Sequence, residues 1–207
     1  MKLIDLTLTV AQAENAFVPQ RIFISGMGGD YTAIVYDYNH SGMVSTYIDF
    51  PGHIEHLNDG THAANCAVEK LYRVTATVIH LDCADGFGAV TADMLKLALK
   101  SDKPSGAMII NALGRRRFDE IKFRSVWLAS DAVKWIVESS IHLLVSDIYE
   151  SEKLHGVFPP LFAAGIYTVC NPVNLHLLTS KRIRITALPL KFEGATQLPC
   201  RLLAEWE

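Results

Sequence analysis

Short runs of β-branched and aromatic residues fill both ends of the chain, a composition that predicts strands. The runs cover residues 3–10, 21–25, 32–38, 43–49, 182–189 and 200–206. We expect these two β-rich ends to meet in one sheet system.

In the centre of the chain, buried-strand patterns alternate with helical ones. The strand runs cover 74–82, 107–113, 141–147 and 166–170, and the helical patterns lie between them. Thr91 is the predicted N-cap of a helix to residue 100, Ser130 that of a helix to 139, and two prolines open a short helix ending at Gly165. Because no repeat or linker divides the chain, we predict one α/β domain over residues 1–207.

Composition excludes several classes of protein. The 207 residues are 50% hydrophobic and 20% charged, with a net charge of −3, so the chain is not disordered. Its basic residues are scattered apart from Arg115–Arg117, which predicts no nucleic-acid partner. The sequence contains no apolar run of about 18 residues, so we expect no membrane span. Asp5 interrupts the N-terminal apolar stretch, so we expect no signal peptide there.

The four cysteines are far apart and form no CxxC motif, a pattern typical of free thiols. Such thiols persist in a reducing compartment. We therefore expect a cytoplasmic protein with no membrane partner.

The densest group of chemically functional side chains follows the strand pattern at 43–49. If this segment is extended, four side chains point to one side: Met43, Ser45, Tyr47 and Asp49. The Pro-Gly step that follows then lets His53 return toward Asp49. A carboxylate with an imidazole supplies either an acid/base pair or metal ligands. The alternative is a solvated loop rich in histidine.

These residues carry a resemblance to a known family. Residues 43–53 resemble the motif H-x-G-T-H-x-D-x-P-x-H of the cyclase family, whose best known members are bacterial kynurenine formamidases. Thr46, Asp49, Pro51 and His53 match the motif. Further similar segments are Ile4–Thr7, Leu71–Arg73, Val78–Asp82, Ala129–Asp147, Leu161–Ile166 and Ala187–Ala195.

The resemblance implies a single α/β domain of the swivelling β/β/α type, with a small β-barrel-like core and flanking helices. It also implies a homodimer in which residues of one protomer approach the pocket of the other. The apolar side chains Phe17, Phe23 and Tyr31 would be covered in such a dimer.

The chain departs from the family at the metal ligands. In metal-dependent members, the first two histidines and the aspartate of the motif hold a divalent metal, and the final histidine acts in catalysis. Here Met43 and Tyr47 replace the two histidines, so only Asp49 and His53 carry over. A thioether and a phenol with a pKa of about 10 are poor ligands for Zn²⁺ or Mn²⁺. We expect a degenerate site with no cofactor.

The family's second pair of ligands, a histidine and a glutamate, aligns with Phe158 and Cys170. In a rearranged site, Asp49 and His53 would hold Zn²⁺ or Mn²⁺ with help from other residues. The histidines that could replace the missing metal ligands are His40, His56, His62 and His155. Cys170 could also be a nucleophile, although an inert strand thiol is the commoner case.

From these residues we expect a hydrolase or cyclase acting on a small activated amide, ester or lactone. His53 is the candidate general base, Asp49 its partner, and Tyr47 the hydrogen-bond donor to the reacting carbonyl. The competing hypothesis is a non-catalytic descendant that binds a small ligand or a partner.

Other candidates are weaker. Arg115–Arg117 could clamp a substrate carboxylate or form a solvated loop. Asp82 and Asp147 end strands at the edge where α/β proteins bind ligands, yet each could cap a turn. Three aromatic residues suit either a pocket wall or a core: Phe50, Trp127 and Phe158.

Overall fold

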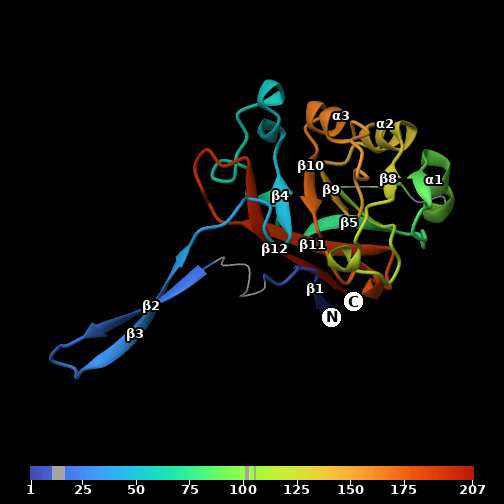
Figure 1. Ribbon diagram of the computed structural model, residues 1–207. Helices are drawn as coiled ribbons and strands as arrows, with labels where there is room; N and C mark the ends of the chain where they lie inside the picture. Colours follow the sequence, from blue (N-terminus) through green and yellow to red (C-terminus); the bar gives the residue numbers. More distant parts are fainter. Residues whose placement is uncertain (11–16, 101–102, 105) are drawn as a thin grey trace.

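Seven strands form a closed ring at the centre of the molecule (Figure 1). The computed structural model describes residues 1–10, 17–100, 103–104 and 106–207, without the side chains of Phe17 and Val18. Around the ring the order is β12, β11, β5, β7, β9, β10 and β4, and β4 pairs back onto β12. The predicted barrel-like core is therefore confirmed. The strands are β1 (Lys2–Asp5), β2 (Phe17–Ile24), β3 (Tyr31–Tyr38), β4 (Tyr47–Asp49), β5 (Val74–His80), β6 (Gly88–Val90), β7 (Ala107–Asn111), β8 (Val126–Leu128), β9 (Leu143–Ser146), β10 (Tyr167–Cys170), β11 (Arg182–Pro189) and β12 (Gln197–Trp206).

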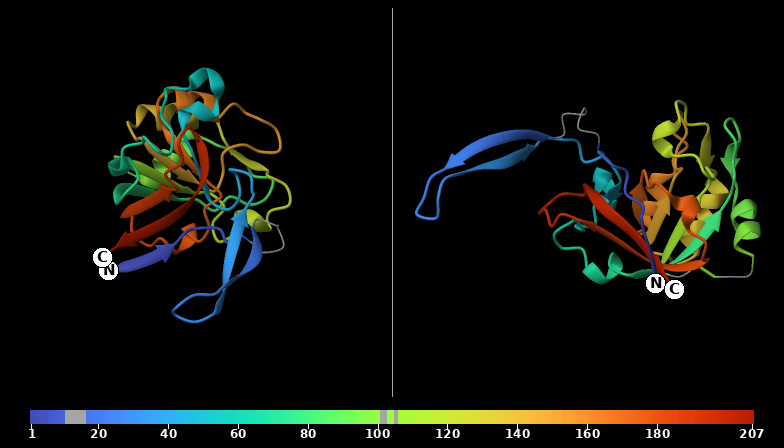
Figure 2. Two further views of the ribbon diagram at one scale, coloured as in Figure 1. Left: turned by 90° about the vertical axis from the view of Figure 1, so that its left-hand side faces the viewer. Right: turned by 90° about the horizontal axis from the view of Figure 1, so that it is seen from below.

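The two ends of the chain meet in this sheet through β1, β4, β11 and β12, as predicted, whereas β2 and β3, which we expected in the same sheet system, form a separate two-stranded sheet. β1 lies antiparallel to β12, with Lys2 opposite Trp206. Figure 2 shows the two termini next to each other in both views. Since the long strand β12 pairs with β4 at its start and with β1 at its end, it joins the two terminal segments to the barrel.

Alternate residues of the parallel strands point into two different apolar cores. On β7, Ala107 and Ile109 lie inside the barrel, whereas Met108 and Ile110 face the helices. A strand buried on both faces is apolar throughout, which is why its sequence shows no alternation. The helices that cover the outer face are α1 (Ala92–Leu99), α2 (Ser130–Glu138) and α3 (Phe158–Ala163).

Two local predictions differ in outcome. Thr91 caps α1 by accepting a hydrogen bond from the backbone nitrogen of Met94 at 3.4 Å, as predicted. Ser130 is the first residue of α2 and not its N-cap. Ala129 holds that position and provides no capping side chain.

The predicted strand at 43–49 is also shorter than expected. Only β4 is extended, and Ser45 has a left-handed backbone with φ of 63°. The cause is Thr46, whose hydroxyl donates to the carbonyl oxygen of Asn171 at 2.7 Å and accepts from the backbone nitrogen of Leu8 at 2.8 Å. These two long-range bonds fold the chain before β4 begins, so residues 43–49 do not form one continuous strand.

The strands β2 and β3 form a ribbon of their own that projects far from the barrel (Figures 1 and 2). Both of its faces are apolar: Phe23 and Ile34 lie on one face, and Ile22 and Tyr31 on the other. Phe23 and Tyr31 are 66% and 59% exposed. Across the described residues, no helix is both long and apolar enough to span a membrane.

Candidate functional site

A cavity of about 420 Å³ opens at one end of the barrel. Asp49 from β4, Cys170 from β10 and Gln197 from β12 line one side of it. Apolar and aromatic side chains, among them Phe118 and Phe158, form much of the remaining wall. A few polar groups in an apolar hollow are typical of a small-molecule site.

Asp49 is buried where three strands meet. β4 lies between β10 and β12, so that Thr168 and Gln197 are its cross-strand neighbours. The amide nitrogen of Gln197 donates to Asp49 Oδ1 at 2.7 Å, and the Cys170 thiol donates to Oδ2 at 3.8 Å. Burial raises the pKa of Asp49, an effect that the Gln197 hydrogen bond and the nearby His53 oppose.

His53 reaches the same cavity from the short 3₁₀ helix at Pro51–His53 that follows β4. Pro51 begins this turn with a fixed φ. Gly52 is required by the close packing, because a Cβ there would lie 2.8 Å from Thr196 Cγ2. The sequence therefore brings His53 back toward Asp49, as the Pro-Gly step predicts.

Gln197 lies between the carboxylate and the imidazole. Its Nε2 is 2.7 Å from Asp49 Oδ1 and 3.3 Å from His53 Nε2. If the amide nitrogen donates to both, His53 Nε2 is the acceptor and the ring proton is on Nδ1. Asp49 and His53 are thus linked through Gln197, which the sequence analysis missed. Gln197 is 148 residues from Asp49, and only the β4–β12 register joins them.

Tyr47 and Cys170 are cross-strand neighbours beside Asp49. Burial, followed by the nearby Cys170 and Asp49, raises the pKa of Tyr47, so its phenol keeps its proton and can donate a hydrogen bond. Burial and Asp49 likewise raise the pKa of Cys170 well above its usual range. A protonated, buried thiol favours the inert interpretation of Cys170 over a nucleophile.

These residues do not fit a divalent metal site. Asp49 Oδ1 already accepts an N–H hydrogen bond, Tyr47 keeps its proton, and Met43 is a 54% exposed thioether. Within the described part of the chain, no three His, Cys, Asp or Glu side chains are placed to hold a metal ion. The donor set therefore departs from that of a catalytic zinc or manganese centre.

The other candidate histidines do not take the metal-ligand positions that Met43 and Tyr47 occupy in this chain. None of them lines the cavity: His40, His56, His62 and His155. His155 stacks on Trp127 instead, with the ring centres 4.3 Å apart. Phe158, which aligns with the family's later histidine, lines the cavity but offers no donor atom.

Two more carboxylates reach the cavity from the opposite wall. Asp147 accepts hydrogen bonds from the backbone nitrogens of Ala112 at 2.8 Å and Leu113 at 3.0 Å. Burial raises the pKa of Asp147 to about 7. Glu150 accepts from two backbone nitrogens in the loop 155–157. Both side chains hold loops in place, but the partners of Asp147 belong to the loop after β7 and not to a turn that follows Asp147.

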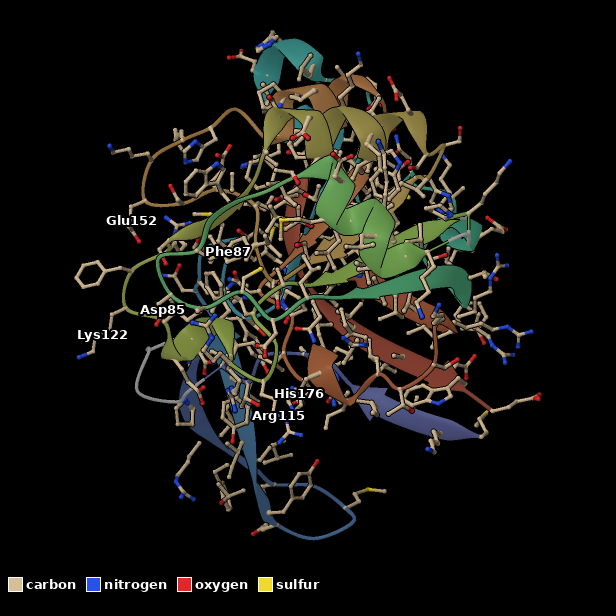
Figure 3. All side chains as sticks on the ribbon, turned by 90° about the vertical axis from the view of Figure 1, so that its right-hand side faces the viewer. Asp85, Phe87, Arg115, Lys122, Glu152 and His176 are labelled. Atoms are coloured by element: carbon tan, nitrogen blue, oxygen red, sulfur yellow. The ribbon has the colours of Figure 1, made fainter. Side chains whose placement is uncertain are left out.

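The basic run lies outside the cavity. Arg116 pairs with Asp85, and Arg117 pairs with Asp119 at 2.7 Å. Arg115 lines a separate surface groove with Asp82 and His176. Figure 3 shows Arg115 and His176 close together, above the blue β2–β3 ribbon in that view. Phe50 packs against Tyr167 in the barrel core.

Comparisons with known proteins agree on the fold. The family model named Cyclase matches residues 4–153. Isatin hydrolase A from Ralstonia solanacearum has a TM-score of 0.74 and 19% identity, covering 98% of this chain and 91% of that one. An isatin hydrolase bound to the product analogue thioisatinate gives a TM-score of 0.71 at 19% identity, with the same coverages of 98% and 91%.

A predicted metal-dependent hydrolase from Bacillus stearothermophilus gives a TM-score of 0.68 at 20% identity, covering 98% of this chain and 97% of that one. A comparison with curated proteins gives no match. At identities this low, the structural neighbours establish a shared fold and not a shared substrate.

Proposed function

This chain belongs to the cyclase family, and on that premise we propose that it is a hydrolase or cyclase acting on a small activated amide, ester or lactone. The observation that carries the proposal is the connection from Asp49 through Gln197 to His53, which opens onto an apolar cavity. The cavity combines an acidic group, a basic group and an apolar wall. This combination suits a small substrate that carries a polar reacting group.

In this proposal His53 acts as the general base. Its Nε2 exchanges the long 3.3 Å contact with Gln197 for a water molecule or an acidic C–H group and accepts the proton. The positive charge that then forms on the imidazole is stabilised by the negative charge of the nearby Asp49 carboxylate, which the Gln197 amide holds in place. Tyr47 keeps its hydroxyl proton and donates a hydrogen bond to the oxygen that becomes negative.

Turnover is proposed to need no resident divalent metal, because the donor atoms around Asp49 do not form a metal site. Without Lewis-acid help, substrates with activated carbonyls are favoured over peptide-like amides. Elemental analysis of untagged protein tests this part. Substoichiometric zinc and manganese, unchanged in Asp49→Ala, is the expected result. One equivalent that is lost in Asp49→Ala would contradict it.

The direct test of activity compares N-formyl aromatic amines, aryl esters and lactones as substrates. Replacing a positioned base costs about 10²–10⁴-fold in rate, so His53→Ala is expected to lose activity by that factor. His56→Ala is the matched control, because His56 lies only three residues away and does not line the cavity. Equal rates in wild type and His53→Ala would remove His53 from the mechanism. Binding without turnover in wild type would favour the non-catalytic hypothesis.

The homodimer is proposed from the β2–β3 ribbon. A two-stranded hairpin is marginally stable alone in water, and this one exposes apolar side chains on both faces, among them Phe23 and Tyr31. Strands of eight residues make a ribbon about 26 Å long at ~3.3 Å per residue. Each ribbon is about 10 Å wide and has two faces. If the two protomers exchange their ribbons, the ribbons and the surfaces that they cover bury about 2,000 Å² in total, which is enough for a stable dimer.

Light scattering tests the dimer. We expect a mass of twice 22.9 kDa at micromolar concentration. Ile34→Glu, on the ribbon, should give monomer, whereas Leu97→Glu, at an 80% exposed site on α1, should leave the dimer intact. A wild-type mass of 22.9 kDa would contradict the dimer.

A further inference from the structure

Arg124 is the only lysine or arginine among the described residues that line the cavity. It lies two residues before β8 and is half exposed at the cavity rim. Its charge also acts on the Tyr47 phenol at the reactive end of the cavity. The guanidinium thus lies at the mouth of the cavity, and its positive charge interacts with Tyr47.

The carboxylates around the cavity are already occupied. Asp85 is paired with Arg116, and Asp49 with the Gln197 amide. The two carboxylates of the opposite wall accept backbone N–H hydrogen bonds. A cationic ligand would have to displace one of these partners. The wall therefore offers little free negative charge to a ligand.

The guanidinium of Arg124 is held much more loosely, although the backbone nitrogen of Arg124 donates to Glu152 Oε1 at 2.9 Å. Its partner Glu152 is 55% exposed, and the distance from Arg124 Nε to Glu152 Oε1 is 3.7 Å. An exposed ion pair of this kind contributes little stability, about 0–1 kcal/mol, so a ligand anion can replace it. Figure 3 shows Glu152 and Lys122 projecting outward on the same side of the molecule. Within the described part of the chain the guanidinium donates no hydrogen bond, so its N–H donors remain available to a ligand.

We propose that Arg124 binds the carboxylate of an aromatic substrate, so that the site selects aryl esters or amides that carry an acidic group. The aromatic ring would lie against Phe118 and Phe158, with its reacting carbonyl toward Tyr47 and His53. A guanidinium presents paired N–H donors that match a carboxylate. The choice of substrate rests on the proposed function, but the binding of the anion does not.

Two esters that differ by one carboxylate test the selection. Arg124→Gln is expected to lower kcat/KM for 4-acetoxybenzoate by about 10–100-fold, the usual size of a lost charged hydrogen bond, and to change phenyl acetate by less than about twofold. Lys122→Gln is the matched control, because Lys122 lies in the same segment but outside the cavity, and it should change neither rate. Equal losses on both esters would overturn the proposal.

Binding separates this inference from the proposed activity. By calorimetry, wild type should bind benzoate at least about tenfold more tightly than benzyl alcohol, and Arg124→Gln should abolish the difference. If benzoate binding depends on Arg124 while neither ester is hydrolysed, the carboxylate site stands and the proposed hydrolase fails. If Arg124→Gln binds benzoate as wild type does, the carboxylate site is wrong whatever the activity.

Discussion

Two groups of buried carboxylates face one cavity, and they differ in what holds them. Asp49 is held by side chains, the Gln197 amide and the Cys170 thiol. Asp147 and Glu150 are held by backbone N–H groups. A side-chain partner can move during a reaction. A backbone N–H partner instead ties the carboxylate to the loop that carries the N–H group. A raised pKa and a place in the wall therefore do not by themselves make a carboxylate catalytic.

The largest effect is expected at Asp49. Asp49→Asn keeps an oxygen that can accept from Gln197 but removes the charge that stabilises the imidazolium. We expect kcat/KM for an activated aryl ester to fall by about 10²–10³-fold, with little change in Tm. Asp147→Asn, measured beside it, should lose less than about tenfold. A larger loss of kcat/KM in Asp147→Asn than in Asp49→Asn would contradict the distinction between the two groups of carboxylates.

The next effect concerns stability at Asp147. Its pKa is raised from 3.8 to about 7, so the folded protein holds a proton that the unfolded chain releases between these values. The stabilisation is complete below pH 4 and is lost as the pH rises through about 7, at up to ~1.4 kcal/mol per pH unit.

Urea unfolding at pH 5 and pH 7 measures this effect. Wild type should lose about 2 kcal/mol more than Asp147→Asn over that interval, because the amide does not titrate. An identical pH dependence in the two proteins would show that Asp147 does not take up a proton on folding.

The smallest effect is expected at Gln197, which contacts Asp49 and His53 and positions the pair. Gln197→Leu should lower kcat by about tenfold through the loss of one hydrogen-bonded link. Gln197→Glu should shift the pH–rate profile upward, since a second carboxylate beside His53 favours its protonated form. A fall in kcat with an unmoved profile in both variants would indicate a structural role only.

How much of the fold can be predicted from the sequence depends on how far apart in the chain the interacting residues lie. Local patterns predict the barrel strands, the helices and the Thr91 cap, because strand burial and capping act over a few residues. The bend at Ser45 depends on distant partners of Thr46, and no local pattern contains them.

The candidate site follows the same rule. The Pro-Gly step predicts that Asp49 and His53 reach one cavity. Gln197 depends on the β4–β12 register, and Arg124 on the placement of a loop, so sequence patterns alone do not single out either residue.

A double-mutant cycle between Asp49 and His53 tests the central claim most directly. The measurement is kcat/KM for one activated aryl ester in wild type, Asp49→Asn, His53→Ala and the double variant. If Asp49 acts only by stabilising the protonated His53, the double variant should be no slower than His53→Ala. Losses that multiply, so that the double variant is slower by the full Asp49→Asn factor, would show that the carboxylate and the imidazole act independently and would contradict the proposed link.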